Sequence, residues 1–393
     1  MDAPSPEDLA PGPLAGLKVV EFTHMVMGPS IGVILGDLGA EVIKIEPEGG
    51  DHTRRLLGSG AGYFPMFNRN KRSICLNLKD ADDLAQARRL VEGADVLIEN
   101  FRPGALERLG LGPDDFAATN PGLIYCSAKG FLSGPYEHRT ALDEVTQMMG
   151  GLAYMTGPPG QPLRAGASVI DITGGMFGVI GILAALDQRH STGKGASVKC
   201  SLFETTAFLV GQHMAQQAVT GAAPNPMPAR ISAWAVYDVF ETAREDERLF
   251  VGVVSDSQWV AFCTAMELSD LGADPTLTAN NDRVRSRDRI LPRVRALFAT
   301  LERAALIEKL EAIGLPFAPV SRPDELFDDP HLNHGGLVDV TIPGGAATRL
   351  PGLPLEFDGQ RLGLRYDVPV ADADRAAILG EAAASVAART CAE

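Results

Sequence analysis

The stretch LKVVEFTHMVMGPSIGVILGDLGAEVIKIE, residues 17–46, contains two short β-rich segments separated by a helical pattern. Residues 17–23 and 41–46 are rich in Val and Ile, whereas residues 28–40 carry apolar side chains at helical spacing. A strand, a helix and a second strand in this order form a βαβ unit with a right-handed crossover. The stretch therefore predicts two parallel strands with a helix packed on one face of their sheet.

The same alternation continues along the first half of the chain. Further strands are expected at residues 73–78, 95–100 and 122–130, with helices at 82–94 and near 104–110. This order predicts an α/β fold with a Rossmann-like parallel sheet. The glycines of HMVMGPSIG, which follows the first strand, do not have the GxGxxG spacing, and this argues against a dinucleotide-dependent dehydrogenase.

Length and charge limit the function further. The chain has 393 residues, enough for two domains, and a formal net charge of −15. Such an acidic chain has no general affinity for nucleic acid or for anionic membranes. An anionic ligand must therefore meet a local group of basic residues.

The chain carries few signs of export or of metal binding. We find no run of ~18 apolar residues, and the acidic, proline-rich start MDAPSPEDLAPGP is unlike a secretory signal. The five cysteines form no CxxC pair and lie near no histidine cluster, which predicts free thiols and no metal site. We expect a cytoplasmic protein without a membrane partner.

Asp171 stands out within RAGASVIDITGGMFG, residues 164–178. It precedes the apolar run GGMFGVIGILAALDQ, residues 174–188, which predicts a helix buried on most faces. An aspartate at this place is commonly an N-cap, although Thr173 is the more natural cap residue. The N-terminus of a buried helix also favours an anion, so a functional carboxylate is the alternative.

Six stretches together resemble the class III CoA-transferases (CaiB/BaiF type), a family that includes formyl-CoA transferase, carnitine CoA-transferase and α-methylacyl-CoA racemase. They occur in order over the first 210 residues: LKVVEFTHMVMGP, LGDLGAEVIKIEP, FNRNKRSI, VLIENFRPGALERLGLG, NPGLIYCSAKGF and RAGASVIDITGGMFGVIGILAALDQRHSTGKG. The resemblance implies an interlocked homodimer in which each chain passes through a ring formed by the other. It also implies a large CoA-binding domain from residues 1–215, a small α+β domain at 225–325, and a segment at 330–393 that returns to the large domain.

The resemblance assigns catalytic roles to two acids. Asp171 matches the family's nucleophile, which forms a mixed anhydride with the acyl group and then a thioester with CoA. Asp143 matches an acidic residue close to that nucleophile. In this scheme CoA enters and leaves as part of an acyl-CoA substrate, so no permanently bound cofactor is expected. The other substrate is a small carboxylic acid.

The resemblance also implies a set of CoA-binding residues, which are His24, Leu76, Lys79, Asn100, Phe101, Arg102 and Arg108. Pro47 replaces an arginine that contacts CoA in formyl-CoA transferase, and Arg54 or Arg72 are candidates to replace that contact. Val26 stands in place of a glutamine of the same enzyme, which argues against formyl or oxalyl specificity.

Leu142 bears on the choice between transfer and racemisation. The racemases carry a histidine at its place, and leucine can neither donate nor accept a proton. CoA transfer is therefore the leading hypothesis, with a racemase or isomerase and a non-catalytic CoA-binding protein as alternatives. Arg139 and Arg164 lie near the active-site segments, and as clamps for a distal carboxylate they favour a C4–C5 dicarboxylate such as succinate.

Overall fold

A six-stranded parallel sheet forms the centre of the larger part of the chain. The computed structural model describes residues 11–390, and the strand order is β3-β2-β1-β4-β5-β6. Along the chain, β1 to β3 extend the sheet in one direction and β4 to β6 extend it in the other, as in Rossmann-like sheets. The loops that follow the neighbouring parallel strands β1 and β4 therefore meet at the carboxyl edge of the sheet. The predicted α/β fold is confirmed. The strands are β1 (Lys18–Phe22), β2 (Glu41–Glu46), β3 (Lys71–Cys75), β4 (Val96–Glu99), β5 (Ile124–Lys129) and β6 (Ser197–Ser201).

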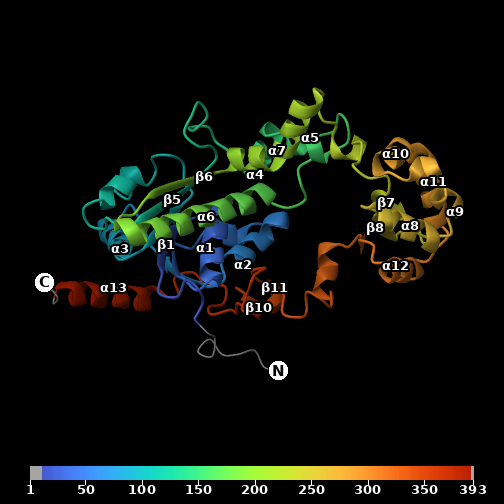
Figure 1. The fold of residues 1–393 in the computed structure, drawn as a ribbon. Helices are drawn as coiled ribbons and strands as arrows, with labels where there is room; N and C mark the ends of the chain where they lie inside the picture. The colour runs from blue at the N-terminus through green and yellow to red at the C-terminus, as the bar shows by residue number, and fades with distance from the viewer. Residues whose placement is uncertain (1–10, 391–393) are drawn as a thin grey trace. The chain divides into compact units, whose positions relative to one another are not determined.

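Both faces of this sheet are covered, because successive strand residues point to opposite sides. Val19 packs into a core with α1 (Met27–Asp37) and α6 (Val169–Thr192), which lie together on one face (Figure 1). Its neighbour Val20 packs into a second core that includes Leu90 of α3 (Ala81–Glu92) and Ile378 of the C-terminal helix α13 (Arg375–Thr390). The near-continuous apolar strands of the sequence thus reflect burial on both faces.

Helix α6 packs unusually closely against α1. A Cβ added at Gly174 would lie 2.8 Å from Met27 Cε, and one added at Gly175 would lie 2.8 Å from Ser30 Cβ. By length and composition α6 could cross a membrane, with a mean hydropathy of 2.0, contrary to our expectation that no segment was long and apolar enough. Of that apolar window 44% is buried in the protein, and core helices of soluble proteins can have the same length and composition.

The chain divides into two compact units. One combines Met1–Pro228 with Pro330–Glu393, and the other is Ala229–Asp329. In the first unit the remaining elements are α2 (Tyr63–Phe67), α3 (Ala81–Glu92), α4 (Asp143–Met149), α5 (Leu152–Thr156), α7 (Leu202–Thr220), β10 (Leu337–Ile342), β11 (Ala346–Pro351), β12 (Glu356–Phe357), β13 (Gln360–Arg361) and α13 (Arg375–Thr390).

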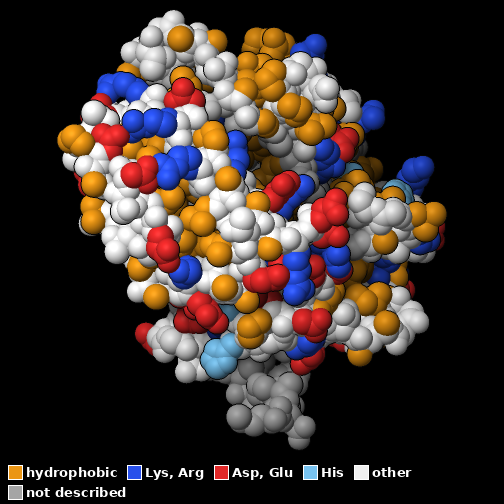
Figure 2. Space-filling view, turned by 90° about the vertical axis from the view of Figure 1, so that its right-hand side faces the viewer, with side chains coloured by type: hydrophobic (Ala, Val, Ile, Leu, Met, Phe, Trp, Pro, Cys, Tyr) orange, Lys and Arg blue, Asp and Glu red, His pale blue; other side chains and the backbone are white. Residues whose placement is uncertain are grey.

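The second unit has an antiparallel sheet with its own core. Phe240, Trp259, Phe262 and Phe298 are buried there. Several arginines of this unit pair with aspartates, for example Arg289 with Asp274, and on the face drawn in Figure 2 basic and acidic side chains are interspersed. The elements are β7 (Tyr237–Glu241), β8 (Arg248–Gly252), β9 (Phe317–Pro319), α8 (Asp256–Ala265), α9 (Ser269–Gly272), α10 (Asn280–Arg285), α11 (Arg287–Phe298) and α12 (Arg303–Ala312).

The C-terminal segment covers the edge strand β3. The backbone N–H of Ser73 donates to Asp374 Oδ2 (2.8 Å), and that of Cys75 donates to Asp372 Oδ1 (2.8 Å). Arg72 adds an ion pair with Glu381 at 2.8 Å. These bonds satisfy groups that an open sheet edge would expose.

Four of the cysteines, Cys75, Cys126, Cys200 and Cys263, are buried free thiols. Cys391 lies outside the described residues. Among the residues that the structure describes, no cluster of three or more His, Cys, Asp or Glu side chains could hold a metal ion.

Charged side chains of β1 and β3 are buried against α1. Lys71 Nζ lies 2.8 Å from Glu21 Oε1, and both side chains are fully buried. Gly32 of α1 leaves room for this pair, because a Cβ added there would lie 1.8 Å from Glu21 Oε2.

We predict that Gly32→Ala destabilises the protein by more than about 2 kcal/mol, since Glu21 cannot move away without breaking a buried ion pair. Gly380 of α13 is the matched control: its added Cβ meets nothing within 4 Å, so Gly380→Ala gains helix propensity of up to about 1 kcal/mol. Urea unfolding of both variants measures the two changes. Equal changes in the free energy of unfolding for the two variants would contradict the buried ion pair as the cause of the destabilisation.

Candidate active site

Asp171 is the third residue of α6, and the helix begins five residues earlier than the sequence predicted. The N-cap residue Ser168 makes no side-chain capping bond. Instead, Oδ2 of Asp143 accepts hydrogen bonds from the backbone N–H groups of Ile170 (2.9 Å) and Asp171 (3.1 Å). Neither Asp171 nor Thr173 caps the helix, so that interpretation was wrong: the capping carboxylate comes from α4.

The other oxygen of Asp143 is also held. Gln147 donates from Nε2 to Asp143 Oδ1 at 2.5 Å, and Arg164 Nη2 lies 3.7 Å from the same oxygen. The side-chain oxygen of Gln147 accepts from the Ala165 N–H at 2.8 Å, which ties down the segment before Asp171. Asp143 is therefore fixed on both sides and buried.

The surroundings of Asp171 raise the pKa of its carboxyl group to about 7. Burial is the largest cause, the nearby Asp143 carboxylate adds to it, and Arg164 opposes it. At neutral pH the group is close to half ionised, and its ionised form is poorly solvated. Such a carboxylate is suited to attack an electrophilic carbonyl carbon.

The loops after β1 and β4 meet beside this helix. The His24 N–H donates to Asn100 Oδ1 (3.0 Å), and Asn100 Nδ2 donates back to the His24 carbonyl (2.8 Å). The His24 ring stacks on Phe101 with centroids 5.4 Å apart. Burial lowers the pKa of His24, which favours the neutral form of its ring. The structure thus brings three of the predicted CoA-binding residues together.

The other predicted CoA-binding residues are placed differently. Lys79, Arg102 and Arg108 are exposed on the segments that follow β3 and β4. The Leu76 side chain is only 1% exposed and belongs to the core, so only its backbone can face a ligand.

Neither candidate replacement for the arginine lost at Pro47 is available. Arg54 donates to both oxygens of Glu46, at 2.7 and 2.6 Å, and Arg72 is paired with Glu41 and Glu381. These guanidinium groups are structural. No sequence motif marks these carboxylate partners, so they could not be recognised from the sequence.

Of the predicted substrate residues, Arg164 lies near Asp171 but is engaged. Its Nη1 donates to Glu144 Oε1 at 2.5 Å. Arg139 stacks on the Tyr136 ring at 4.6 Å and is exposed, as is Leu142 at 59%. The structure does not bring Arg139 into contact with Asp171 or Asp143.

Tyr63 is a residue that sequence reasoning missed. It lies close enough to Arg164 to affect it electrostatically, and it packs in an apolar cluster with Val26 and Ile172. Val26 is itself buried in this cluster, so its side chain fills space rather than facing a substrate. The run GYFPMF, residues 62–67, is rich in aromatic side chains that could line a site, but it contains no motif that indicates a functional role.

The family model for "CoA-transferase family III" matches residues 14–375. The chain belongs to this family. It is 36% identical to the acetyl-CoA:oxalate CoA-transferase of Acetobacter aceti over 91% of each chain. It is 32% identical to the mouse (Mus musculus) succinyl-CoA:glutarate CoA-transferase, over 88% of this chain and 80% of the mouse protein. A crystal structure of a CaiB/BaiF family protein from Brucella suis superposes with a TM-score of 0.83, at 33% identity, covering 95% of this chain and all of that one.

The raised pKa of Asp171 predicts how the stability of this family III CoA-transferase depends on pH. The unfolded carboxyl group has a pKa near 3.9, so the folded state binds the proton more tightly, and stability falls as pH rises from about 4 through 7. Asp171→Asn mimics the neutral form at every pH. We expect its stability advantage over the wild type to be larger at pH 8 than at pH 5 by roughly 1–3 kcal/mol. Urea unfolding at both pH values is the measurement, and a gain that is equal at both would contradict the assignment.

Asp143→Asn tests the charge that raises this pKa. Removing the negative charge lowers the pKa of Asp171, so adding Asp171→Asn in the Asp143→Asn background should stabilise less at pH 8 than it does in the wild type. The control is Glu144→Gln, which removes an exposed charge next in sequence. If Asp171→Asn shows the same coupling free energy with Asp143→Asn as with Glu144→Gln, Asp143 has no special effect on the pKa of Asp171.

Proposed function

We propose that this CoA-transferase moves CoA from an acyl-CoA to a small carboxylic acid through covalent intermediates on Asp171. The observation that carries the proposal is the partly buried carboxylate at the start of α6, with its pKa near 7 and its backbone held by Asp143. Restricted access of water lets such a carboxylate form an anhydride that bulk water would hydrolyse.

The chemistry is a series of balanced acyl exchanges. A carboxylate oxygen of Asp171 attacks the thioester carbonyl, the C–S bond breaks, and CoA leaves as a thiolate. The thiolate then attacks the aspartyl carbonyl, which forms an Asp171–CoA thioester and releases the first acid. The carboxylate of the incoming acid attacks that thioester, the C–S bond breaks, and CoA leaves again as a thiolate, which gives a second anhydride. The thiolate then attacks the carbonyl carbon of the incoming acid in this anhydride and forms the new acyl-CoA. Asp171 is regenerated as a carboxylate, and no net proton is consumed.

CoA is proposed to bind along the loops after β1, β3 and β4. His24, Asn100 and Phe101 form a connected surface at the edge where the sheet order reverses. Nδ1 of His24 is buried without a hydrogen-bond partner among the described residues, which leaves it for a ligand atom. The exposed cations Lys79, Arg102 and Arg108 supply the positive charge that an acidic chain needs for the CoA phosphates.

For the acceptor we propose a C4–C5 dicarboxylate such as succinate. The names of both relatives include a dicarboxylate, oxalate in one and glutarate in the other. Arg164 is within reach of the nucleophile and holds two carboxylates already, so a third anion must compete with Glu144. The Arg139 guanidinium group stacks on the Tyr136 ring and has no side-chain acceptor among the described residues.

Racemisation has less support. It requires an acid and a base on opposite faces of the α-carbon, and the residue next to Asp143 is the exposed Leu142. Solvent deuterium in the α-position of the acyl-CoA would reveal such a reaction directly.

We further propose that the protein is a homodimer, interlocked as in its family, and that it acts in the cytoplasm. Exposed apolar side chains follow one another along α6 and α7, among them Ile180 (59% exposed), Phe208 (71%) and Met214 (64%). A contiguous apolar surface of this kind indicates a protein interface. The buried free thiols fit a reducing compartment.

The test is a screen of acyl-CoA donors against oxalate, succinate, glutarate and monocarboxylates of matched length. We expect CoA transfer to a C4–C5 dicarboxylate, and none with Asp171→Asn. If Arg139 or Arg164 holds the distal carboxylate, its alanine variant should lose about one to two powers of ten in kcat/KM for the dicarboxylate alone. Equal losses with a monocarboxylate acceptor would instead assign the arginine to positioning of Asp143, and preferred transfer to monocarboxylates would contradict the dicarboxylate proposal.

A further inference from the structure

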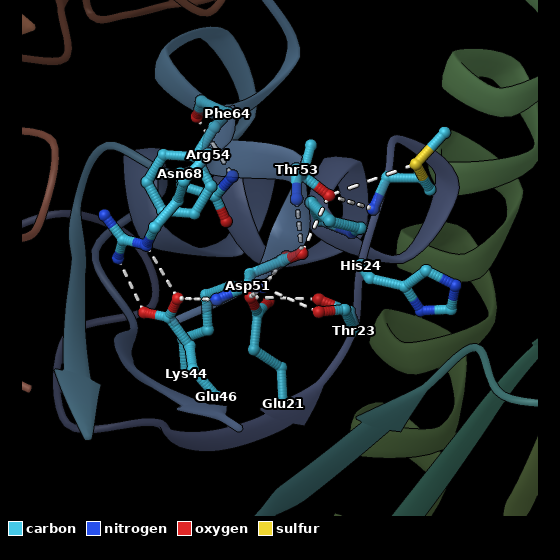
Figure 3. A network of polar contacts seen from close by, with 12 residues as sticks. Glu21, Thr23, His24, Lys44, Glu46, Asp51, Thr53, Arg54, Phe64 and Asn68 are labelled. Carbon is cyan, nitrogen blue, oxygen red and sulfur yellow. Dashed lines mark hydrogen bonds and ion pairs between the residues drawn. The ribbon is translucent and has the colours of Figure 1, made fainter. Parts of the chain in front are cut away.

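A network of buried charges lies beneath the loop that carries His24, and the mechanism above does not use it (Figure 3). Three neighbouring strands each contribute one charged residue, namely Glu21 of β1, Lys44 of β2 and Lys71 of β3. All three side chains are fully buried. Burying three charges costs free energy. Their directional hydrogen bonds can in return fix one backbone conformation that an apolar core would not specify.

Lys71 and Lys44 share Glu21 between them. Lys71 Nζ lies within 3.2 Å of four oxygens, which are Glu21 Oε1 and Oε2, the Pro29 carbonyl and Asn68 Oδ1. Lys44 Nζ lies 3.6 Å from Glu21 Oε1 and 3.3 Å from Asp51 Oδ2. Both ammonium groups therefore have oxygen partners within the protein, and the network is not a vacant ligand site.

Hydrogen bonds at Thr23 and at Met25 connect the network to the β1–α1 loop, residues 23–26. Lys44 Nζ donates to the Thr23 carbonyl at 2.7 Å, and the Thr23 hydroxyl donates to Glu21 Oε1 at 3.1 Å. Thr53 Oγ1 donates to Asp51 Oδ1 at 2.8 Å and accepts from the Met25 N–H at 3.1 Å. Met25 has a φ of 63°, a conformation that a non-glycine residue adopts only when its surroundings hold it. Thr53 supplies a bond at that residue.

The loop held in this way contacts both parts of the candidate site. On one side, the backbone of His24 is bonded to Asn100, and its ring stacks on Phe101. On the other side, Val26 packs in the cluster that includes Ile172, the residue after the nucleophile. A shift of the Met25 backbone would therefore displace His24 directly.

We propose that Glu21, Lys44, Lys71 and Asp51 form a positioning network for the β1–α1 loop, and that Thr53 is the link that sets His24 against the bound CoA. The inference rests on the proposed function, because it assigns CoA to the His24 side of the site. None of the five residues touches the reacting atoms in this account; they act through the backbone of Thr23 and Met25.

Thr53→Val tests the link, with Thr53→Ser as its matched control. Valine keeps the shape of threonine but removes both hydrogen bonds, whereas serine keeps the hydroxyl group. For Thr53→Val we expect KM for the acyl-CoA to rise about three- to tenfold, since the hydrogen bond that holds the Met25 N–H is lost, while KM for the carboxylic acid and kcat change less than about twofold. Amide hydrogen exchange of a peptide covering residues 23–27 should also become faster. Thr53→Ser should restore both values.

The outcomes separate this inference from the proposed function. If the wild type transfers no CoA from any donor, the proposed function fails, and the exchange measurement alone still tests whether Thr53 holds the loop. An active wild type with identical KM values and exchange rates in both variants would overturn the positioning role. A uniform loss in kcat and in both KM values would also overturn it, because it would indicate a general structural role. Should Thr53→Val not fold, Thr53→Ala carries the same test.

Discussion

The carboxylate of Asp143 accepts hydrogen bonds from two backbone N–H groups at the start of α6, and the position of Asp171, the proposed nucleophile, depends on them. Without a distant acceptor, the first turn of α6 would leave these groups unsatisfied. The capping charge also lies beside the Asp171 carboxylate and helps to raise its pKa to about 7. One interaction therefore sets both the place and the protonation of the group proposed to attack the thioester.

Packing in the remainder of the first unit fixes the position of that helix end relative to the sheet. Glycines on α6 allow α1 to approach closely, and α1 itself begins at the loop that leaves β1. Beneath this loop the pair of Glu21 and Lys71 requires Gly32, so the close packing and the buried charges constrain one another. The result is a rigid connection from the centre of the sheet to the residues on either side of Asp171.

The sequence predicted this architecture because its signals are local. Val and Ile runs define the strands, and the helical spacing of residues 28–40 places α1 within a few positions of its observed ends. The start of α6 was misplaced for the opposite reason: its capping carboxylate lies 28 residues before Asp171 and has no local signature. Arg54 and Arg72 were taken as candidate phosphate contacts for the same reason, since only the fold shows that Glu46 and Glu381 already hold them. Tyr63 escaped notice because it approaches the site from another element.

The central claim is that Asp171 carries the acyl group and then CoA during turnover. The most direct measurement is mass spectrometry of the enzyme after turnover of an acyl-CoA in the presence of hydroxylamine, which attacks activated acyl carbons. The account predicts a hydroxamate on Asp171 in the wild type and an unmodified residue in the enzyme incubated with hydroxylamine alone. Sustained CoA transfer with Asp171 unmodified, or with the hydroxamate on another carboxylate, would contradict it.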